Sequence, residues 1–174
     1  MKYFHYVVTA FLVLLPVKNF SQNLKKETYG FKSLSTGIGI CSGQKNDGRL
    51  NFYIDLTTEY KKNLFSLSFS TGAEFNLFDA SRDYKEFDLL YGREFKLADF
   101  FVIEAHTGIG IFNESYKDYS SDFKKMSEST IALPIKIKML FYVSKNFALG
   151  LNPNLTLNKI DNIYSGNLVL QWKL

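Results

Sequence analysis

Cysteine is almost missing from this sequence of 174 residues. Cys41 stands alone, so the chain can form no internal disulfide, and it lies too far from the N-terminus to carry a lipid anchor. We expect it to be a small buried residue on a strand. The phosphate-binding and dinucleotide-binding patterns GxxxxGK(S/T) and GxGxxG are missing as well, which removes two common classes of nucleotide site.

Long apolar runs are also lacking, with one exception near the N-terminus. Residues 7–17 (VVTAFLVLLPV) are apolar, follow Lys2 and precede a short polar segment, which is the order of a secretory signal. A run of about eleven residues is too short to cross a bilayer, which takes about 20. We predict a signal peptide over residues 1–21, cut after Ser21, followed by a periplasmic N-terminal tail over 22–32.

Neither sign of charge is in large excess. The net charge of +4 includes Lys2 and Lys18 of the predicted signal, so the exported chain is closer to neutral. A charge balance of this kind does not indicate a basic surface for nucleic acid, and no nucleic-acid partner is expected. The exported part, about 150 residues long, suits one domain, which we place over residues 33–174.

The sequence is rich in aromatic residues, with 17 Phe and 11 Tyr, and in alternation of period two. Eight segments alternate between apolar residues and small or polar ones, and each is predicted to be a strand: 34–41, 50–57, 65–74, 87–94, 101–111, 131–141, 149–157 and 168–174. The stretch TGIGI occurs in the first and fifth segments, at 36–40 and 107–111. We expect its glycines to face a crowded interior, where they make room for larger groups.

The connections between these segments alternate in length. Short turns follow the second, fourth and sixth segments, at 61–63, 96–99 and 144–146. Longer polar loops follow the first, third, fifth and seventh, and the longest is predicted from about Asn113 to Ser127. This arrangement indicates an up-and-down meander of antiparallel strands with the short turns at one end and the loops at the other.

Alternation alone does not say which face meets lipid, because a soluble sandwich also alternates. Two observations favour an apolar exterior. The apolar residues are too many and too large for the interior of an eight-stranded barrel, which side chains just fill. The aromatic residues next to the short turns also share the apolar face at one height. This predicted aromatic girdle at a membrane boundary comprises Tyr60, Phe65, Phe95, Phe101, Phe141, Phe147 and Trp172.

With these patterns the chain resembles the small outer-membrane β-barrel proteins of Gram-negative bacteria, and its Ser21-Gln22 junction is similar to signals of Bacteroidota envelope proteins. The resemblance implies an all-β, eight-stranded antiparallel up-and-down transmembrane barrel with short periplasmic turns and long extracellular loops. It also implies outer-membrane lipid and the barrel-insertion machinery as partners. The family usually ends on an aromatic residue, whereas this chain ends Trp172-Lys173-Leu174.

Ionisable residues collect on the polar face of the predicted strands. Inside a barrel such charges must be paired, because an isolated charge is costly to desolvate. Pairing of the fifth and sixth segments about their loop would place Glu104 roughly opposite Lys136. The predicted interior polar network is either a set of structural ion pairs or a narrow polar, porin-like path, and it comprises Asp55, Glu74, Asp88, Glu104, His106, Lys136 and Lys138.

His106 invites comparison with lipid A deacylases, which are barrels of this size and use a Ser–His–acid site. The run Glu104-Ala-His106-Thr-Gly108 has no serine two residues after the histidine, where those enzymes place it, and His106 is expected to point inward. No catalytic residue is assigned. No cofactor or metal is expected either, because the exported chain has one histidine and one cysteine, which form no ligand cluster. An acidic calcium site around Asp118 and Asp122 would lack the EF-hand spacing.

Aromatic and charged residues mix in the longest predicted loop. Tyr116, Tyr119 and Phe123 are candidates for contact with a surface ligand of unknown identity, or for packing over the barrel mouth. The function predicted from the sequence is non-enzymatic: an envelope-structural or surface-interaction role through extracellular loops. The alternatives are a lipid-modifying barrel enzyme and a soluble secreted β-sandwich.

Overall fold

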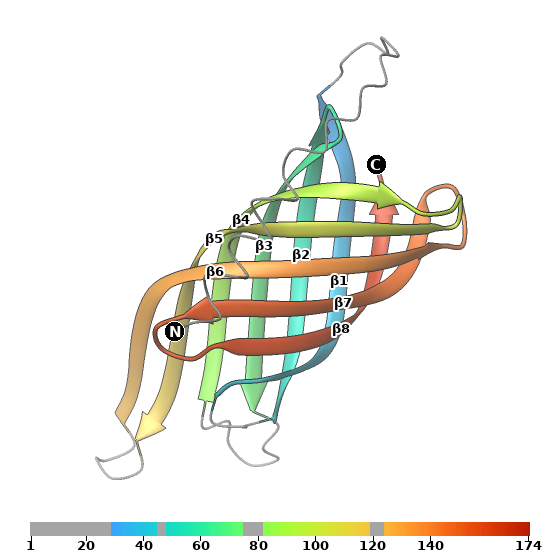
Figure 1. Cartoon of the computed structure of the whole chain (residues 1–174). Coiled ribbons are helices and arrows are strands. Elements are labelled where there is room, and N and C mark those ends of the chain that lie inside the picture. The colour runs from blue at the N-terminus through green and yellow to red at the C-terminus, as the bar shows by residue number, and fades with distance from the viewer. Residues whose placement is uncertain (1–28, 45–47, 75–81, 119–123) are drawn as a thin grey trace, which may run out of the picture.

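The protein is a closed barrel of eight antiparallel strands (Figure 1). The computed structural model describes residues 29–44, 48–74, 82–118 and 124–174; the predicted signal peptide lies outside them. The strands are β1 (Gly30–Ser42), β2 (Gly48–Tyr60), β3 (Asn63–Glu74), β4 (Arg82–Lys96), β5 (Phe101–Asp118), β6 (Lys124–Tyr142), β7 (Phe147–Asn158) and β8 (Ile163–Lys173). Among the described residues no helix is long and apolar enough to cross a membrane.

Each strand pairs with its neighbours in sequence, and β1 pairs with β8 to close the barrel. The closing ladder runs from Ser33 opposite Lys173 to Ser42 opposite Tyr164. Closure leaves one sheet rather than two packed layers, so the sandwich alternative is wrong.

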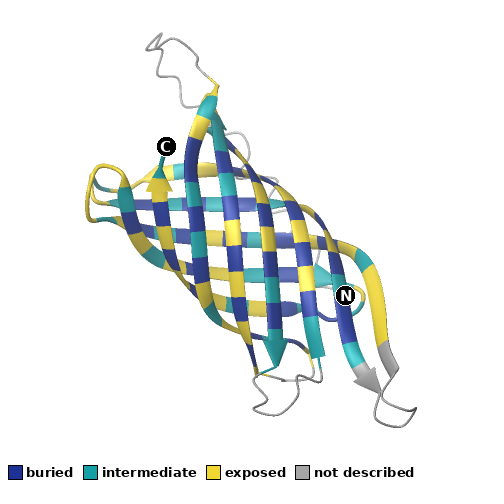
Figure 2. Cartoon of the chain, turned by 180° about the vertical axis from the view of Figure 1, so that it is seen from behind, coloured by how far each residue is buried: buried dark blue, intermediate teal, exposed yellow. Residues whose placement is uncertain are grey.

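The two faces of the wall are reversed relative to a soluble protein, as Figure 2 shows by its regular change of colour along each strand. Ile38 and Ile40 of the first TGIGI are exposed, whereas Ser35 and Gly37 beside them are buried. The same alternation holds in the second copy, where Ile109 and Ile111 face outward. The apolar residues therefore form the exterior and the polar ones the interior, as the sequence predicted.

The barrel has two different ends. The connections from β2 to β3, from β4 to β5 and from β6 to β7, at 61–62, 97–100 and 143–146, lie at the turn end. The connections from β1 to β2, from β3 to β4, from β5 to β6 and from β7 to β8 belong to the loop end. The β2–β3 turn is tight: Lys61 and Lys62 both have positive φ, 50° and 68°. Two successive residues of this kind match the right-handed twist of a hairpin.

Three predicted boundaries were wrong. The loop predicted from Asn113 to Ser127 is largely strand, because β5 continues to Asp118 and β6 begins at Lys124. The polar residues pair instead of looping out, and Asn113 donates hydrogen bonds to the hydroxyls of Ser127 and Ser129 at 3.0 and 2.8 Å. The β7–β8 connection, predicted to be long, spans only 159–162. The predicted tail also ends earlier than expected, because β1 begins at Gly30.

Candidate functional site: the filled interior and the loop-end rim

Lys138 of β6 lies at the centre of a buried ion network. Its Nζ is 2.9 Å from Asp55 Oδ2 of β2 and 4.0 Å from Glu104 Oε2 of β5. It also donates a hydrogen bond of 3.2 Å to Ser35 Oγ of β1. All four side chains are buried, so each charge depends on its partners for stabilisation rather than on water.

Glu104 joins this centre to the turn end. Lys32 Nζ lies 3.3 Å from its Oε1 and also pairs with Glu94. Gln171 Nε2 of β8 donates to the same oxygen at 3.3 Å, and His106 Nε2 lies 3.4 Å from Oε2. The carboxylate therefore has partners from β1, β5, β6 and β8. It connects β1 and β8, the two strands whose pairing closes the barrel, through side-chain contacts in the interior.

Lys136 forms a second pair within the same interior. Its Nζ is 2.9 Å from Asp88 Oδ2 of β4 and donates to Ser68 Oγ of β3. In the ladder, Lys136 lies opposite His106, and Glu104 lies opposite Lys138, so the predicted pairing of Glu104 with Lys136 was wrong by two positions. The centre of the β5–β6 hairpin lies one residue beyond the midpoint of the predicted loop. Because the two strands run in opposite directions from this centre, a shift of one residue changes the partner of every residue by two positions.

Six residues of the predicted interior polar network are buried in these contacts, and Glu74 is apart from them. It is half-buried at the last position of β3, opposite Arg49 in the ladder.

A second charged cluster closes the loop end, and its residues were not predicted from the sequence. Arg49 Nη2 lies 3.2 Å from Glu114 Oε1 and 3.0 Å from Asp161 Oδ2, and Arg82 Nε lies 3.6 Å from Glu114 Oε1. The backbone N–H of Gln44 donates to Asp161 Oδ1 at 2.6 Å. Arg49 shares the parity of Asn51 and Asp55, a signal that could have identified it, whereas Glu114 and Asp161 lay in segments predicted to be loops.

Apolar layers fill the rest of the lumen. Near the loop end Cys41, Tyr84, Phe112, Ala132 and Ile163 form one buried cluster, so Cys41 lies where the sequence predicted. A second cluster, nearer the turn end, comprises Tyr53, Val102, Leu140, Ala148 and Val169. Together with the ion pairs these side chains fill the bore, as expected for eight strands.

The interior glycines make this packing possible. A Cβ on Gly37, in the first TGIGI, would lie 2.2 Å from Tyr53 Cε1, and one on Gly110, in the second, would lie 2.1 Å from Asp88 Oδ1. Real Cβ atoms essentially never come this close to another heavy atom. The repeated motif therefore provides space for one large aromatic ring and one buried carboxylate.

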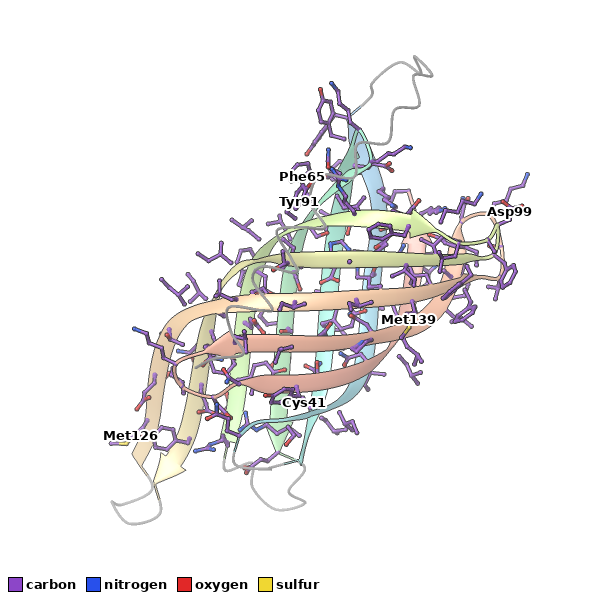
Figure 3. The ribbon with its side chains drawn as sticks, viewed as in Figure 1. Cys41, Phe65, Tyr91, Asp99, Met126 and Met139 are labelled. Carbon is purple, nitrogen blue, oxygen red and sulfur yellow. The ribbon has the colours of Figure 1, made fainter. Side chains whose placement is uncertain are left out.

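The predicted girdle residues lie on the exterior, near the turn end. Phe101 stacks on Phe141 at 4.6 Å between ring centroids, and Phe147 lies 5.2 Å from Trp172. Phe65 contacts Tyr91 edge-on at 5.7 Å (Figure 3). The two remaining members, Tyr60 and Phe95, are exposed on the same face. Aromatic pairs of this geometry stabilise the neighbouring strands that carry them.

Beyond this ring the turn end carries an exposed ion pair. Lys96 donates to Asp99 Oδ1 at 2.7 Å, and both side chains are exposed. The hydrogen bond and charge of Lys96 lower the pKa of the Asp99 carboxyl.

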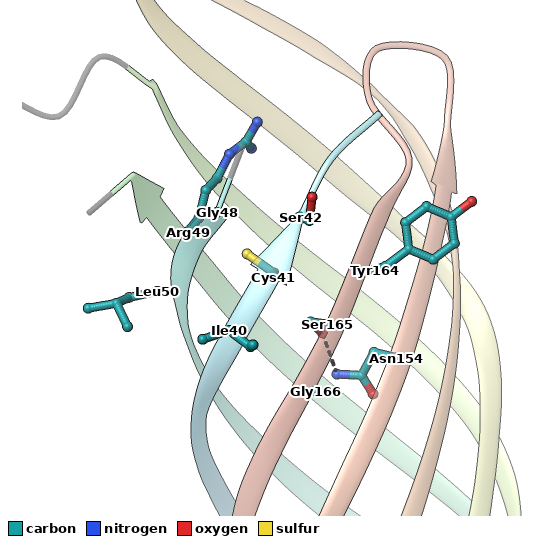
Figure 4. A pocket seen from close by; sticks show the side chains of 10 residues that line it. All are labelled: Ile40, Cys41, Ser42, Gly48, Arg49, Leu50, Asn154, Tyr164, Ser165 and Gly166. Atoms are coloured by element: carbon teal, nitrogen blue, oxygen red, sulfur yellow. Dashed lines mark hydrogen bonds between the residues drawn. The ribbon is translucent and has the colours of Figure 1, made fainter. Parts of the chain in front are cut away.

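A hollow of about 900 Å³ marks the exterior near the loop end, across β1, β2, β7 and β8 (Figure 4). Ile40, Leu50 and Tyr164 line it, together with Gly48 and Gly166. An added Cβ would meet nothing within 4 Å at either glycine. The hollow is thus a gap in the apolar surface where two side chains are missing.

The residues considered for chemistry do not form a catalytic or metal site in the described part of the chain. The side-chain partner of His106 is Glu104, and its ring is buried inside the barrel. No group of three His, Cys, Asp or Glu residues among those described could hold a metal ion. The side chain of Asp118, and Asp122, Tyr119 and Phe123, lie outside the described residues.

Tyr116 is the described member of the loop contact candidates. It is half-buried on the mouth-facing side of β5, where Arg82 lies over its ring at 5.9 Å. Its hydroxyl donates to Glu128 Oε1 of β6 at 3.4 Å. These contacts hold the ring on the β5–β6 hairpin.

No protein-family model matches the chain, and no curated protein matches its sequence. Solved structures match its fold. Neisserial surface protein A superposes with a TM-score of 0.68 at 8% identity, covering 85% of this chain and 100% of that one. Ail, the attachment invasion locus protein of Yersinia pestis, gives 0.60 at 13% identity, with 85% and 99% covered.

The N-terminal β-barrel domain of OprF from Pseudomonas aeruginosa also matches, with a TM-score of 0.54 at 10% identity, covering 83% of this chain and 100% of that domain. At such low identities the likeness shows the fold alone. The chain has the fold of the small eight-stranded outer-membrane barrels.

Proposed function

We propose that this protein is a non-enzymatic outer-membrane barrel that anchors a surface-interaction site, or a structural contact of the envelope, at its loop end. The observation that carries the proposal is the reversal of the two faces. Soluble proteins rarely expose contiguous apolar patches larger than a few hundred Å², whereas here the exposed large side chains of all eight strands are predominantly apolar.

The closed ladder supports the same conclusion. In hydrocarbon every backbone N–H and C=O needs a partner within the protein, and in a closed barrel the neighbouring strands provide it. The filled interior supports a role as an anchor, because ion pairs and apolar layers occupy the bore. The girdle would then lie at the periplasmic boundary, with the turn end in the periplasm and the loop end outside the cell.

Several partners belong to this proposal. Outer-membrane lipid would cover the apolar exterior, and the barrel-insertion machinery would place the chain there after export by the segment 1–21. The Bacteroidota-like origin is proposed on the Ser21-Gln22 junction alone. A surface ligand, unidentified, would meet the loop end near Tyr116.

The structural neighbours suggest the kind of role by analogy. Ail is named for attachment and invasion, and a further structure shows it in complex with the heparin analogue sucrose octasulfate. The lipid-modifying alternative gains no support from the described residues, because His106 faces Glu104 inside the barrel and not the lipid.

The test is site-specific labelling of intact cells. In a Cys41→Ala background, Ser127→Cys places a thiol at the loop end and Lys145→Cys places one in the β6–β7 turn; both positions are exposed. A membrane-impermeant maleimide is expected to label the first in intact cells and the second only after permeabilisation.

The same protein, extracted from membranes, is expected to change its gel mobility on boiling in SDS, as a folded barrel does. Recovery in the soluble fraction, or labelling of Lys145→Cys alone in intact cells, would contradict the proposal.

A further inference from the structure

The loop-end part of β6 has a strand on one side only. Its ladder with β5 continues to Asp118 opposite Lys124, but its ladder with β7 ends at Ala132 opposite Asn158. Figure 1 shows the β5–β6 hairpin extending past the β7–β8 hairpin at this end. Residues 126–131 of β6, named the free edge below, therefore have no neighbouring strand on the β7 side among the described residues.

Pro134 identifies which backbone groups point to this side. The β5–β6 ladder is interrupted beside it, whereas the β6–β7 ladder passes through it, with Pro134 opposite Thr156. Because proline has no N–H, the interruption means that the residues of even number in β6 direct their N–H to β5. Since backbone groups alternate along a strand, Ser127, Ser129 and Ile131 direct theirs to the free edge.

The free edge is accessible in the described part of the chain. Met126 and Ile131 are 40% and 65% exposed, and Ser127, Glu128 and Ser129 between them are exposed as well. Figure 2 shows the exposed stretch where β6 leaves the barrel. Among the described residues, the backbone of the free edge accepts one side-chain hydrogen bond. It is a long bond of 3.5 Å from Thr130 Oγ1 to the carbonyl oxygen of the next residue, Ile131.

The free edge has few of the features that normally keep an edge strand from pairing with another chain. Native edges carry proline, several charges or a bulge, whereas the free edge (MSESTI) has one charge and no proline, and its ladder with β5 is regular. The hairpin is also held in place, by the bonds of Asn113 to Ser127 and Ser129 and by the pairing of Arg82 in β4 with Tyr116 in β5. An ordered, open edge loses little entropy when a further strand adds to it.

We propose that the free edge of β6 binds an extended peptide segment of another protein, which adds to the barrel wall as one more strand. This inference rests on the proposed surface role and names its partner class. Backbone hydrogen bonds to Ser127, Ser129 and Ile131 supply affinity, and the side chains on the two faces of the strand supply specificity.

Those side chains define the chemistry of the partner. Glu128 is exposed on the mouth-facing side, so a lysine or arginine opposite it forms a favourable cross-strand pair. Ser127 and Ser129 on the outer side suit small or β-branched neighbours, and Ile131 suits an apolar one. The partner segment is therefore a strand with one basic residue among small and β-branched residues.

A second copy of the chain fits less well. Two barrels in one membrane, related by an axis along the membrane normal, would bring their β6 edges together in parallel and at the same height. Each Glu128 would then lie near the other, which is unfavourable, and parallel pairing is slightly weaker than antiparallel pairing.

The experiment uses the full barrel in lipid nanodiscs. The probe is a blocked peptide of alternating valine and threonine with one central lysine, and a matched peptide has glutamate in that place. Hydrogen exchange of the protein amides is followed by NMR. The lysine peptide is expected to slow exchange at Ser127, Ser129 and Ile131, and the glutamate peptide to bind more weakly.

Ser129→Pro removes one edge donor without removing a donor to β5. Ser129→Ala removes the same hydroxyl, which accepts a hydrogen bond from Asn113, but keeps the edge donor. The first is expected to weaken peptide binding about tenfold and the second to leave it unchanged, with unchanged gel mobility showing that both fold. Equal binding by both, or no protection by the lysine peptide, would overturn the proposal.

If the free edge instead bound the free edge of a second copy of the chain, the protein would form an oligomer that Ser129→Pro dissociates. This outcome would also overturn the proposal. Failure of the edge leaves the labelling result on intact cells unaffected, so it is distinguishable from failure of the surface role.

Discussion

At the scale of single residues, the absence of a side chain at Gly37 decides how the interior packs. A Cβ there would lie 2.2 Å from Tyr53 Cε1 and 2.8 Å from the carbonyl oxygen of Leu168. The backbone contact cannot be relieved by a rotamer change, so Gly37→Ala must move either the wall or the ring. Overpacking of this kind is expected to lower the free energy of unfolding by about 1–3 kcal/mol, measured by urea unfolding in lipid vesicles.

Gly166 provides the matched control for this substitution. It also lies within a strand, β8, but is exposed, and an added Cβ would meet nothing within 4 Å. Gly166→Ala is therefore expected to leave stability unchanged or slightly raised. Equal losses at Gly37 and Gly166 would show that strand propensity, rather than interior space, places the glycines.

At the scale of elements, the β2–β3 turn has the right shape but an unfavourable sequence. Lys61 and Lys62 adopt positive φ, a conformation that glycine and asparagine adopt at lower cost than lysine. Lys62→Gly is expected to raise the free energy of unfolding by about 1 kcal/mol. The measurement is the same urea titration, and Lys145→Gly in the exposed β6–β7 turn, a position without positive φ, is expected to give no such gain.

The elements also show how far sequence reasoning reaches. Alternation identified all eight strands and their outward faces, because each strand has one face towards an apolar environment and the other towards a crowded polar interior. It failed from Asn113 to Ser127, because both faces of the hairpin near its tip carry polar residues and the pattern disappears although the strands continue. The same error displaced the predicted pairing of Glu104.

Contacts across the lumen were beyond prediction for a different reason. Arg49 meets Glu114 and Asp161, residues that come from strands and turns far apart in the sequence. Which interior residues meet depends on strand tilt and on the register of closure, and local alternation contains neither quantity. Parity could place Arg49 inside the barrel but could not choose its partners.

At the scale of the whole molecule, the interior charges behave as one unit, because side chains from most of the strands contribute to it. Lys138 is shared by Asp55 and Glu104, and Glu104 also has Lys32 as a partner. Lys138→Met would therefore remove the cation that lies 2.9 Å from Asp55 Oδ2. Removing one partner of a buried pair costs about 3–5 kcal/mol, and a loss of this size is expected in the urea titration.

The double variant Lys138→Met/Asp55→Leu separates charge from packing. Replacing both members of a buried pair by apolar residues is often neutral, and Lys32 remains beside Glu104. The double variant is therefore expected to recover most of the stability that the single variant loses. If both variants were equally unstable, the contribution of Lys138 would be its packing within the lumen. If neither lost stability, water or the neighbouring Lys136, which also interacts with Asp55, would stabilise the Asp55 charge without Lys138.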